Sequence, residues 1–535
     1  MTLWGNTKDD EPEDNGQNGD SSSRVVQSQP EPQPRASTET DERTRLLPPR
    51  PAEGYLSPDD PAVSPYNLWS VRFLRYFTVF FAIITFLWWV LLLVSIFVSP
   101  PGMHSRGSGF FDFSYTTLTL GLLLLGLISF STPSKAAQVS CLIVAVVLLL
   151  DMILIITVPR LRVEEGWVGI ASVIWAVLIA IWTIITDRIV AWGKREEEER
   201  LTGRAESRRT LGEWTSVLFS TVVLIAMAAV AILLSATLIL RSRDSSLHAP
   251  GERIFVDGAK YQIHLYCEGS TNVTNAAGKK LPTVLFEAGD GPFEHGMISI
   301  ATNALANGSI SRYCYSDRPG FGWSDNSPSP FSAGMAADVL SEALARAGED
   351  GPWVLASAGV GSIYSRIFSS RHGGDVQGLL LIDPLHEDLL YRLGSPHRGF
   401  LLWAWGIISP LGLDRTPAAI FKGRTREDRV YGRSAYQNGK FIKAKLQESL
   451  VADSLTKNEV SSARHIQSET TPLALISSGI EIKRDRTWEQ KQEDLSHLTN
   501  NLISWDIVSK APSEVWRTLN GREIIEKRLA ELVHA

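Results

Sequence analysis

The sequence predicts a membrane α-helical bundle of about five spans, followed by an α/β domain with a mostly parallel sheet and helices on both faces. Three observations lead to this fold class. Apolar runs of spanning length crowd the region 71–241, and strand-like and helical patterns alternate over 251–535. Residues 1–65, by contrast, contain almost no apolar clusters.

The segment 1–65 is rich in Pro, Ser, Gln, Asp and Glu, and it buries too little apolar surface to offset the cost of ordering. We therefore expect a disordered, acidic tail. It has neither the apolar core of a secretory signal nor the Arg-rich composition of a transit peptide. Within it, Glu42-Arg-Thr-Arg-Leu46-Leu47 resembles the acidic dileucine signal that sorting adaptors bind on proteins destined for vacuoles and lysosomes, although so short a pattern also arises by chance.

Composition excludes several classes of function. The net charge of -6 and the absence of a basic stripe interleaved with aromatic residues argue against a nucleic-acid partner. Three cysteines cannot form a disulfide framework or a Cys-rich metal site, and we predict no metal and no cofactor. Cys141 lies in an apolar run, whereas Cys267 and Cys314 lie in predicted core strands. The ordinary interpretation of all three is a small buried hydrophobic residue.

The apolar runs in the region 71–241 are each close to the roughly 20 residues that cross a bilayer as a helix. The second run is the shortest and the third contains an acidic residue, so four spans is the alternative to five. Trp88, Trp89, Trp167 and Trp214 lie near the ends of runs, as interfacial aromatic residues do. The five runs cover approximately residues 76–98, 113–130, 139–158, 167–185 and 214–240.

The charge of the loops predicts the orientation of the chain. Basic residues gather on the cytosolic side of membrane proteins, and five spans place the two ends of the chain on opposite sides. The predicted topology is a cytosolic N-terminus and a lumenal C-terminal domain. Ten basic residues then face the cytosol (Arg72, Arg75, Lys135, Arg188, Lys194, Arg195, Arg200, Arg204, Arg208 and Arg209), against five on the other side (Arg106, Arg160, Arg162, Arg241 and Arg243).

Two glycosylation sequons support the same orientation. Asn272-Val-Thr and Asn307-Gly-Ser both fall in the C-terminal domain, in surroundings typical of loops. Together with the dileucine pattern, they favour an integral protein of the endomembrane system, with the vacuolar membrane as the expected location and a mitochondrial membrane as the alternative.

Asp151 lies within the third apolar run, where an ionised carboxylate is costly and is therefore protonated, paired or functional. We expect a neutral carboxyl group hydrogen-bonded to a serine or threonine, such as Thr117 or Ser172. A proton or ion pathway, as in a transporter-like membrane module, is the less favoured hypothesis because no basic residue of another span is placed to pair with it.

Motifs in the C-terminal region, 251–535, point to a known fold. Strands are predicted near residues 261–267, 283–287, 311–316, 353–356, 378–382, 472–476 and 502–508. The segments His264-Leu-Tyr-Cys-Glu-Gly269, Phe286-Glu-Ala-Gly-Asp-Gly291, Ser316-Asp-Arg-Pro-Gly-Phe-Gly-Trp-Ser324 and Ile382-Asp-Pro-Leu-His386 follow one another in order. They resemble an α/β-hydrolase, and with the spans the chain is similar to a fungal family of membrane proteins with a hydrolase-like domain of unknown function, some labelled mitochondrial.

The segment Pro352 to Arg366 is similar to the nucleophile elbow of these enzymes, a sharp strand-to-helix turn with the motif Gly-x-Ser-x-Gly. Aligned without gaps, it places Ser357 at the first Gly and Gly359 at the nucleophile. The resemblance implies that Gly289, Asp290 and Gly291 form the oxyanion loop. It also implies that Asp317 and Arg318 brace that loop.

The other members of the catalytic triad are also altered. The histidine is expected in a segment such as Ala-Pro-His-Glu-x-Trp, and Ser513 stands in its place. Asp383 or Asp485 remains as the acid, but without a histidine it has no imidazole to orient. Ser357 is expected to be a small residue tolerated at the elbow, and His386 a packing or hydrogen-bonding residue beside Asp383.

The insertion at about 389–470 occupies the place of a lid in these enzymes, and its run Phe400-Leu-Leu-Trp-Ala-Trp-Gly-Ile-Ile could cover a pocket or touch the bilayer. The leading hypothesis is a membrane-anchored, catalytically degenerate hydrolase-fold protein that binds a lipid-like ligand or a protein partner, in contact with membrane lipids. The alternative is an active serine hydrolase of ester bonds that uses Ser357. The third hypothesis is a transporter-like membrane module with Asp151 at its centre.

Overall fold

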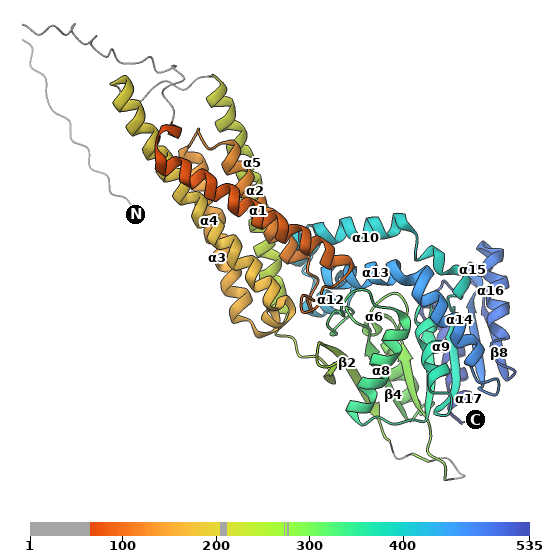
Figure 1. Cartoon of the computed structure of the whole chain (residues 1–535). Helices are drawn as coiled ribbons and strands as arrows, with labels where there is room; N and C mark the ends of the chain where they lie inside the picture. The colour runs from red at the N-terminus through yellow and green to blue at the C-terminus, as the bar shows by residue number, and fades with distance from the viewer. Residues whose placement is uncertain (1–64, 204–210, 272, 275–277, 535) are drawn as a thin grey trace, which may run out of the picture. The chain divides into compact units, whose positions relative to one another are not determined.

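The computed structural model describes residues 65–203, 211–271, 273–274 and 278–534. Nearly all of the predicted tail, with Glu42, Leu46 and Leu47, lies outside the described residues, and so does Asn272. We describe the remainder, from the membrane helices to the C-terminal domain, in chain order (Figure 1).

Within the described residues, five helices are long and apolar enough to cross a membrane. Each contains one predicted run to within two residues at its ends, and several extend further because apolarity marks the bilayer core and not the end of a helix. The fourth helix is kinked at Gly166, which has a φ of 63°. After the short turn η1 (Pro65–Asn67), the helices are α1 (Trp69–Phe97), α2 (Phe110–Ile128), α3 (Lys135–Thr157), α4 (Pro159–Thr202) and α5 (Leu211–Asp244).

Indole hydrogen bonds join α1 to α4. Trp182 donates to Thr78 at 3.1 Å and Trp175 donates to Thr85 at 2.9 Å, so the two contacts repeat at a seven-residue spacing on both helices. Each threonine hydroxyl in turn donates to the carbonyl four residues earlier, which satisfies it within its own helix. Such interhelical bonds stabilise packing where the hydrophobic effect between spans is absent.

The C-terminal domain contains an eight-stranded sheet with the order β1-β2-β4-β3-β5-β6-β7-β8. β2 pairs antiparallel with β1 and β4, and the remaining neighbours are parallel, which is the arrangement of an α/β-hydrolase. β1 was not predicted. The strands are β1 (Glu252–Val256), β2 (Tyr261–Gly269), β3 (Thr283–Glu287), β4 (Arg312–Asp317), β5 (Trp353–Ala358), β6 (Val376–Ile382), β7 (Leu473–Ser478) and β8 (Leu502–Val508).

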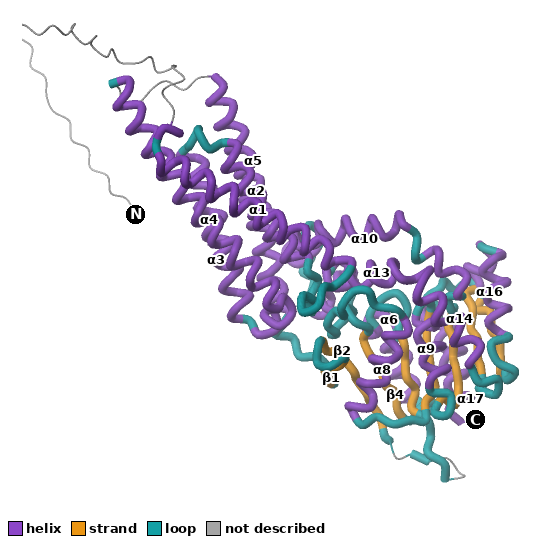
Figure 2. The backbone as a smooth tube through the Cα atoms, viewed as in Figure 1, coloured by secondary structure: helices purple, strands orange, loops and turns teal. Residues whose placement is uncertain are grey.

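Helices cover both faces of this sheet, as Figure 2 shows. On one face, apolar residues of α6 (Phe293–Gly296), α7 (Ile298–Ala306) and α17 (Leu519–His534) bury the side chains of alternate strand positions. On the other face, α8 (Ala333–Ala347), α9 (Gly361–Arg371) and α14 (Lys457–Ile466) do the same. The remaining helices of the C-terminal end are α15 (Gly479–Arg484), α16 (Arg486–Ser496) and η6 (Val515–Arg517).

The insertion between β6 and β7 is almost entirely helical. Its longest helices, α10 and α13, pack against each other. Gly406 of α10 packs so tightly on the ring of Phe110, at the start of α2, that a methyl group there would overlap it. The insertion consists of η2 (Glu387–Arg392), α10 (Pro396–Ile408), η3 (Ser409–Leu411), α11 (Arg415–Phe421), α12 (Arg426–Val430), η4 (Arg433–Gln437), α13 (Gly439–Val451), the π-helical turn η5 (Ala452–Thr456) and α14.

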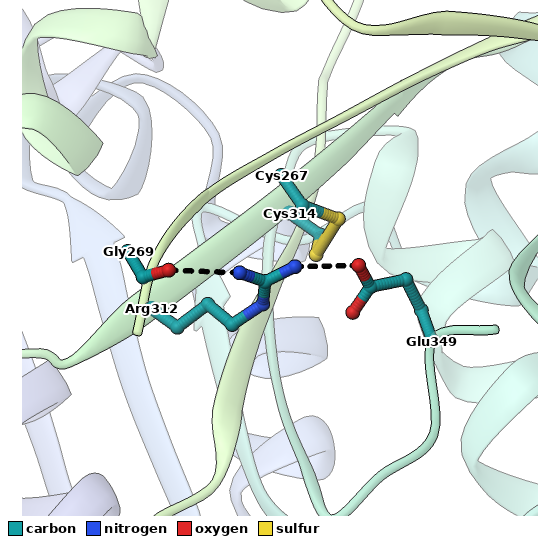
Figure 3. The surroundings of a disulfide bond; sticks show 5 residues. All are labelled: Cys267, Gly269, Arg312, Cys314 and Glu349. Carbon is teal, nitrogen blue, oxygen red and sulfur yellow. Dashed lines mark hydrogen bonds and ion pairs between the residues drawn. A yellow bond between two sulfur atoms is a disulfide. The ribbon is translucent and has the colours of Figure 1, made fainter. Parts of the chain in front are cut away.

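Cys267 and Cys314 are more than the small buried hydrophobic residues of the ordinary interpretation, which left open whether they are bonded. The two residues are directly opposed in the antiparallel pair β2–β4, and their sulfur atoms form a disulfide. Arg312 beside them donates to Gly269 O at 2.9 Å and to Glu349 at 2.5 Å (Figure 3). Sequence analysis missed the bond because strand register, which brings residues 47 positions apart into contact, cannot be read from two isolated cysteines.

Candidate functional site

The turn after β5 has the geometry of a nucleophile elbow. Gly359 stands at its apex with a φ of 50°, in the left-handed region. Its N–H donates to Ile382 O at 3.0 Å, and its carbonyl accepts hydrogen bonds from the Leu385 N–H at 3.0 Å and the Ser362 hydroxyl at 2.7 Å. The apex is therefore fixed from both sides by the sheet and by α9.

A side chain would fit at this apex. A Cβ atom on Gly359 would have Gly289 Cα, 4.0 Å away, as its one neighbour within 4 Å, whereas a Cβ on Gly361 would lie 2.8 Å from Glu287 O and overlap Ala288 O. Gly361 is thus required for the close approach of α9 to β3, and Gly359 is not required by space. The apex therefore has room for a side chain, and Gly359 supplies none.

A cavity of about 120 Å³ lies at this apex. It brings together the predicted oxyanion loop, the predicted nucleophile position and the predicted histidine position. Two further polar side chains that sequence analysis did not single out also line it: His295 of α6 and Tyr436 of η4. The lining includes Gly289, Asp290, Gly291, His295, Gly359, Tyr436, Ser513, Glu514 and Trp516.

Tyr436 reaches the oxyanion loop from the insertion. A methyl group on Gly291 would overlap the Tyr436 hydroxyl, and the ring of His295 packs edge-on against the Tyr436 ring with centroids 5.9 Å apart. Burial raises the pKa of Tyr436 to about 12, so its hydroxyl is a neutral hydrogen-bond donor. No local signal marked this residue, because its partners lie more than a hundred positions away in the sequence.

Asp383 occupies the acid position at the end of β6. Its Oδ1 accepts hydrogen bonds from the Ser478 N–H and from Trp488 Nε1, both at 3.1 Å. Burial raises the pKa of Asp383, and hydrogen bonds from Ser478, Ser513 and Trp488 partly oppose this. Asp383 and Ser513, the predicted acid and histidine positions, are therefore neighbours.

Three other candidate residues lie elsewhere. Ser357 is within β5 with 0% exposure, its hydroxyl has no hydrogen-bond partner among the described residues, and it does not line the elbow cavity. His386 caps η2, accepting from the Asp388 N–H at 3.0 Å, and bonds Asp494 at 2.6 Å. Asp485 caps α16 and pairs with Arg392 at 2.8 Å.

Arg318 lies beneath the oxyanion loop and donates a hydrogen bond to the Gly289 carbonyl. It also lies 3.4 Å from both Glu287 and Glu448, and its guanidinium stacks on Tyr364. Burial raises the pKa of Glu287 to about 8 even though Arg318 opposes the shift. This contact is the bracing role expected for Arg318. Asp317 instead bonds His264 at 3.1 Å and the Trp323 N–H at 3.0 Å.

Relatives of the whole chain are known. An uncharacterized protein of Schizosaccharomyces pombe is 33% identical over 507 residues, which cover 89% of this chain and 93% of that protein. The chain belongs to the same family as this yeast protein. The pattern of a region of unknown function, DUF2417, matches residues 42–267, from the tail through the spans to β2.

A more distant member comes from Saccharomyces cerevisiae. It is described as an uncharacterized vacuolar membrane protein and is 26% identical over 386 residues, covering 61% of this chain and 59% of that protein. Among these relatives, the Saccharomyces cerevisiae protein is thus the one whose name assigns it to a membrane, that of the vacuole.

Solved structures resemble the C-terminal half of this family member. An α/β-hydrolase enzyme from a Medee basin deep-sea metagenome has a TM-score of 0.37 at 10% identity, with 52% of this chain and 96% of that chain covered. The Cif epoxide hydrolase of Acinetobacter nosocomialis has a TM-score of 0.40 at 14% identity, with 57% and 96% covered.

The intramembrane acid has a different partner from those expected. Asp151 is fully buried and accepts a hydrogen bond from the Tyr115 hydroxyl at 3.1 Å. Thr117 and Ser172 instead accept indole hydrogen bonds from Trp89 and Trp88. The expectation of Thr117 or Ser172 as the partner was therefore wrong: the hydrogen-bond donor is a tyrosine, and tryptophans of α1 bond both of the hydroxyls that were expected.

Of the two sequons, Asn307 is described. It follows α7 on the surface, and its amide donates to Glu526 at 2.7 Å. Its exposure is what a glycosylation acceptor needs, since the modifying enzyme must reach the amide nitrogen.

Proposed function

We propose that the C-terminal domain is a catalytically degenerate hydrolase-fold module that binds a lipid-like ligand in the elbow cavity without hydrolysing it. The observation that carries this proposal is Gly359, which occupies an intact elbow apex and has no hydroxyl group. In one serine protease, loss of the serine or the histidine alone lowers turnover roughly a million-fold, so the remaining oxyanion loop would not sustain useful rates.

Binding remains chemically reasonable because the cavity retains donors and apolar walls. The Tyr436 hydroxyl can donate to a carbonyl or ester oxygen, and Trp516 and Met297 supply apolar contact. A volume of about 120 Å³ suits a compact polar group rather than an acyl chain. Any chain would therefore extend out of the cavity.

The contacts of the insertion favour a lipid-like ligand over a protein partner. Tyr436 belongs to η4, which packs on α13, and α13 packs on α10. In turn, α10 contacts the membrane helices through Gly406 against Phe110 and through Trp403, whose ring centroid is 6.4 Å from that of Phe97 of α1. The element that closes the cavity is thus anchored on the spans, where lipids are the available ligands.

The alternative, an active serine hydrolase based on Ser357, has no observation in its favour. Its hydroxyl lies in a buried strand position and not at the apex. The test is labelling of the purified full-length protein with a fluorophosphonate probe, and we expect no labelling of the wild type. Stoichiometric labelling that disappears in Ser357→Ala would overturn the proposal.

The matched gain experiment restores the missing groups. Gly359→Ser with Ser513→His places a hydroxyl at the apex and an imidazole near Asp383, and we expect the probe to label this double variant. Gly359→Ala with Ser513→His is the control, because it has a side chain at the same apex and the same imidazole but no hydroxyl group to act as a nucleophile. If the serine variant is folded but also stays unlabelled, the loss of these two side chains alone does not account for the absence of activity.

We also propose that the protein resides in the vacuolar membrane, on the basis of its Saccharomyces cerevisiae relative and the Leu46-Leu47 pattern. A fluorescently tagged protein should mark that membrane, and replacing both leucines with alanine should redistribute it to other endomembranes. Colocalisation of the wild type with a mitochondrial marker would contradict this location.

A further inference from the structure

A second, strongly charged cavity lies away from the elbow, where the ends of the membrane helices meet the insertion and the edge of the sheet. Its volume is about 60 Å³. It is lined by side chains from α2, α4, α5, β1, α11 and α13. Five of the lining residues are cations (Arg160, Arg241, Arg253, Arg415 and Lys440), and two are carboxylates (Glu164 and Asp244).

The carboxylates are already shared between cations. Glu164 pairs with Arg160 at 3.0 Å and with Arg241 at 2.8 Å. Asp244 pairs with Arg415 at 2.9 Å and also with Arg429 at 2.5 Å. Two carboxylates outside the cavity add to this network, Asp325 beside Arg160 at 2.6 Å and Glu165 beside Arg241 at 2.6 Å.

Two cations remain without a carboxylate. Within the described residues, neither Arg253 nor Lys440 forms an ion pair. Lys440 Nζ donates to the Gly322 carbonyl at 3.1 Å, and the Arg253 guanidinium lies over the Trp323 ring, 5.7 Å from its centroid, with its Nε unbonded. The four cations of the ion-paired network match its four carboxylates, so Arg253 and Lys440 add two positive charges beside it.

Arg415 provides a donor that is both buried and unused. Its side chain is 5% exposed, and its Nε has no hydrogen-bond partner among the described residues even though its Nη2 pairs with Asp244. A buried guanidinium donor without an acceptor costs free energy, and an anion in the adjacent cavity would supply that acceptor.

From this geometry we infer that the cavity binds a phosphate group, carried by the headgroup of an anionic lipid or by a soluble phosphate. Guanidinium and ammonium groups from five separate elements line this one cavity. Arginine forks match phosphate oxygens in geometry and charge. The site lies where the membrane helices α2 and α4 begin and α5 ends.

The pKa values of two of these cations reflect their burial and the positive charges around them. Burial lowers the pKa of Lys440 to about 8, and the positive charges of Arg160 and Arg253 contribute to this shift. Burial and the neighbouring Arg241 and Arg429 likewise lower the pKa of Arg415 to about 10. All remain charged at neutral pH, so the repulsion among them is present and a bound dianion would relieve it.

The test uses the full-length protein in detergent and measures ligand affinity by the shift in thermal unfolding. The probes are inorganic phosphate, dihexanoyl phosphatidic acid, and dihexanoylglycerol, which has the same chains without a phosphate. We expect phosphatidic acid to bind and dihexanoylglycerol not to. Tighter binding of phosphatidic acid than of phosphate identifies a lipid headgroup as the source, and equal binding identifies soluble phosphate.

The variants are Arg253→Gln, Lys440→Gln and their combination. These side chains are outside the ion-paired network, so the fold should tolerate their change, and the unfolding curve without ligand verifies this. Each should weaken binding about tenfold, since each removes one charge-assisted contact. Lys440→Arg should keep most of the affinity. Lys260→Gln is the control, because Lys260 is exposed and pairs with Asp257 of its own turn.

Two outcomes would overturn the inference. One is equal binding of dihexanoylglycerol and phosphatidic acid, which would show that the chains and not the phosphate are recognised. The other is unchanged affinity in a folded Arg253→Gln, Lys440→Gln double variant. Neither outcome bears on the elbow cavity, so this inference and the proposed function stand or fall separately.

Discussion

A methyl group would have different consequences at three glycines of the elbow region. At Gly361 it would overlap the Ala288 carbonyl, at Gly359 it would meet open space but with φ at 50°, and at Gly374 it would meet open space in an exposed turn. Substitutions at these three glycines therefore distinguish the cost of steric overlap from the cost of a left-handed backbone conformation.

We predict that alanine substitutions will follow this order in stability. Gly361→Ala should lower the free energy of unfolding by about 2–3 kcal/mol because β3 and α9 must separate. Gly359→Ala should cost about 1–2 kcal/mol for the left-handed conformation alone. Gly374→Ala, the control, should change it by less than about 0.5 kcal/mol. The midpoint of thermal unfolding in detergent measures this, and a greater loss at Gly359 than at Gly361 would contradict the assignment of the apex.

Sequence analysis located the residues of the elbow because they belong to one continuous turn and to short motifs. The structure places Gly359, Gly289 and Ser513 around one cavity. Sequence analysis did not find Tyr436 or His295, because neither residue is part of a motif. Both reach the cavity only when distant segments of the chain fold together. The burial of Lys445, which bonds Asp290 at 3.1 Å, was likewise invisible because a lysine in a helix is normally solvated.

At the scale of elements, the pairing of β2 with β4 creates a cross-strand disulfide. Disulfides persist in oxidising compartments and are rare in the cytosol. A lumenal C-terminal domain, which loop charges and sequons predict, would lie in such a compartment, and this topology stays a prediction. Cys141 of α3 remains a free, buried thiol.

We predict that protein extracted under denaturing, non-reducing conditions will accept one maleimide tag per chain, on Cys141, and three after reduction. The Cys267→Ser, Cys314→Ser double variant should be destabilised by about 2–4 kcal/mol, since the bond closes a loop of 47 residues. A reductant should lower the unfolding midpoint of the wild type but not that of the double variant. Three tags before reduction would show that the bond does not form in the cell.

The sequence predicted which segments are helices and strands more reliably than it predicted which residues of these elements contact one another. Apolar runs predicted the spans because a bilayer tolerates few polar residues, and alternating patterns predicted seven of the strands. β1 was missed because Glu252–Val256 is short and exposed at the edge of the sheet. The indole bonds that join α1 to α4 depend on helix rotation, which hydropathy does not determine.

At the scale of the whole molecule, the described structure joins two architectures through the insertion. Asp244 at the end of α5 pairs with Arg415 and Arg429, and Arg160 at the start of α4 pairs with Asp325. These buried ion pairs lie on one side of the spans, together with the hydrolase-like domain. Whatever compartment this side faces, the elbow cavity, the disulfide and Asn307 face it together.

Glycosylation of the C-terminal domain would identify the compartment that it faces. If the domain is lumenal, Asn272 and Asn307 should be glycosylated, and endoglycosidase should increase the mobility of the protein on a gel. Asn272→Gln should remove one part of this shift and Asn307→Gln the other. Asn307 is exposed, and its hydrogen bond to Glu526 lies at the surface, so its loss should not prevent folding. Ser309→Thr and Ser309→Ala form a matched pair, since the first keeps the Asn307 sequon and the second destroys it without changing the asparagine. The expected result is a full shift in Ser309→Thr and a reduced shift in Ser309→Ala. An unglycosylated wild type whose C-terminal domain is digested by protease added outside intact vacuoles would place the domain in the cytosol, and the disulfide should then be absent as well.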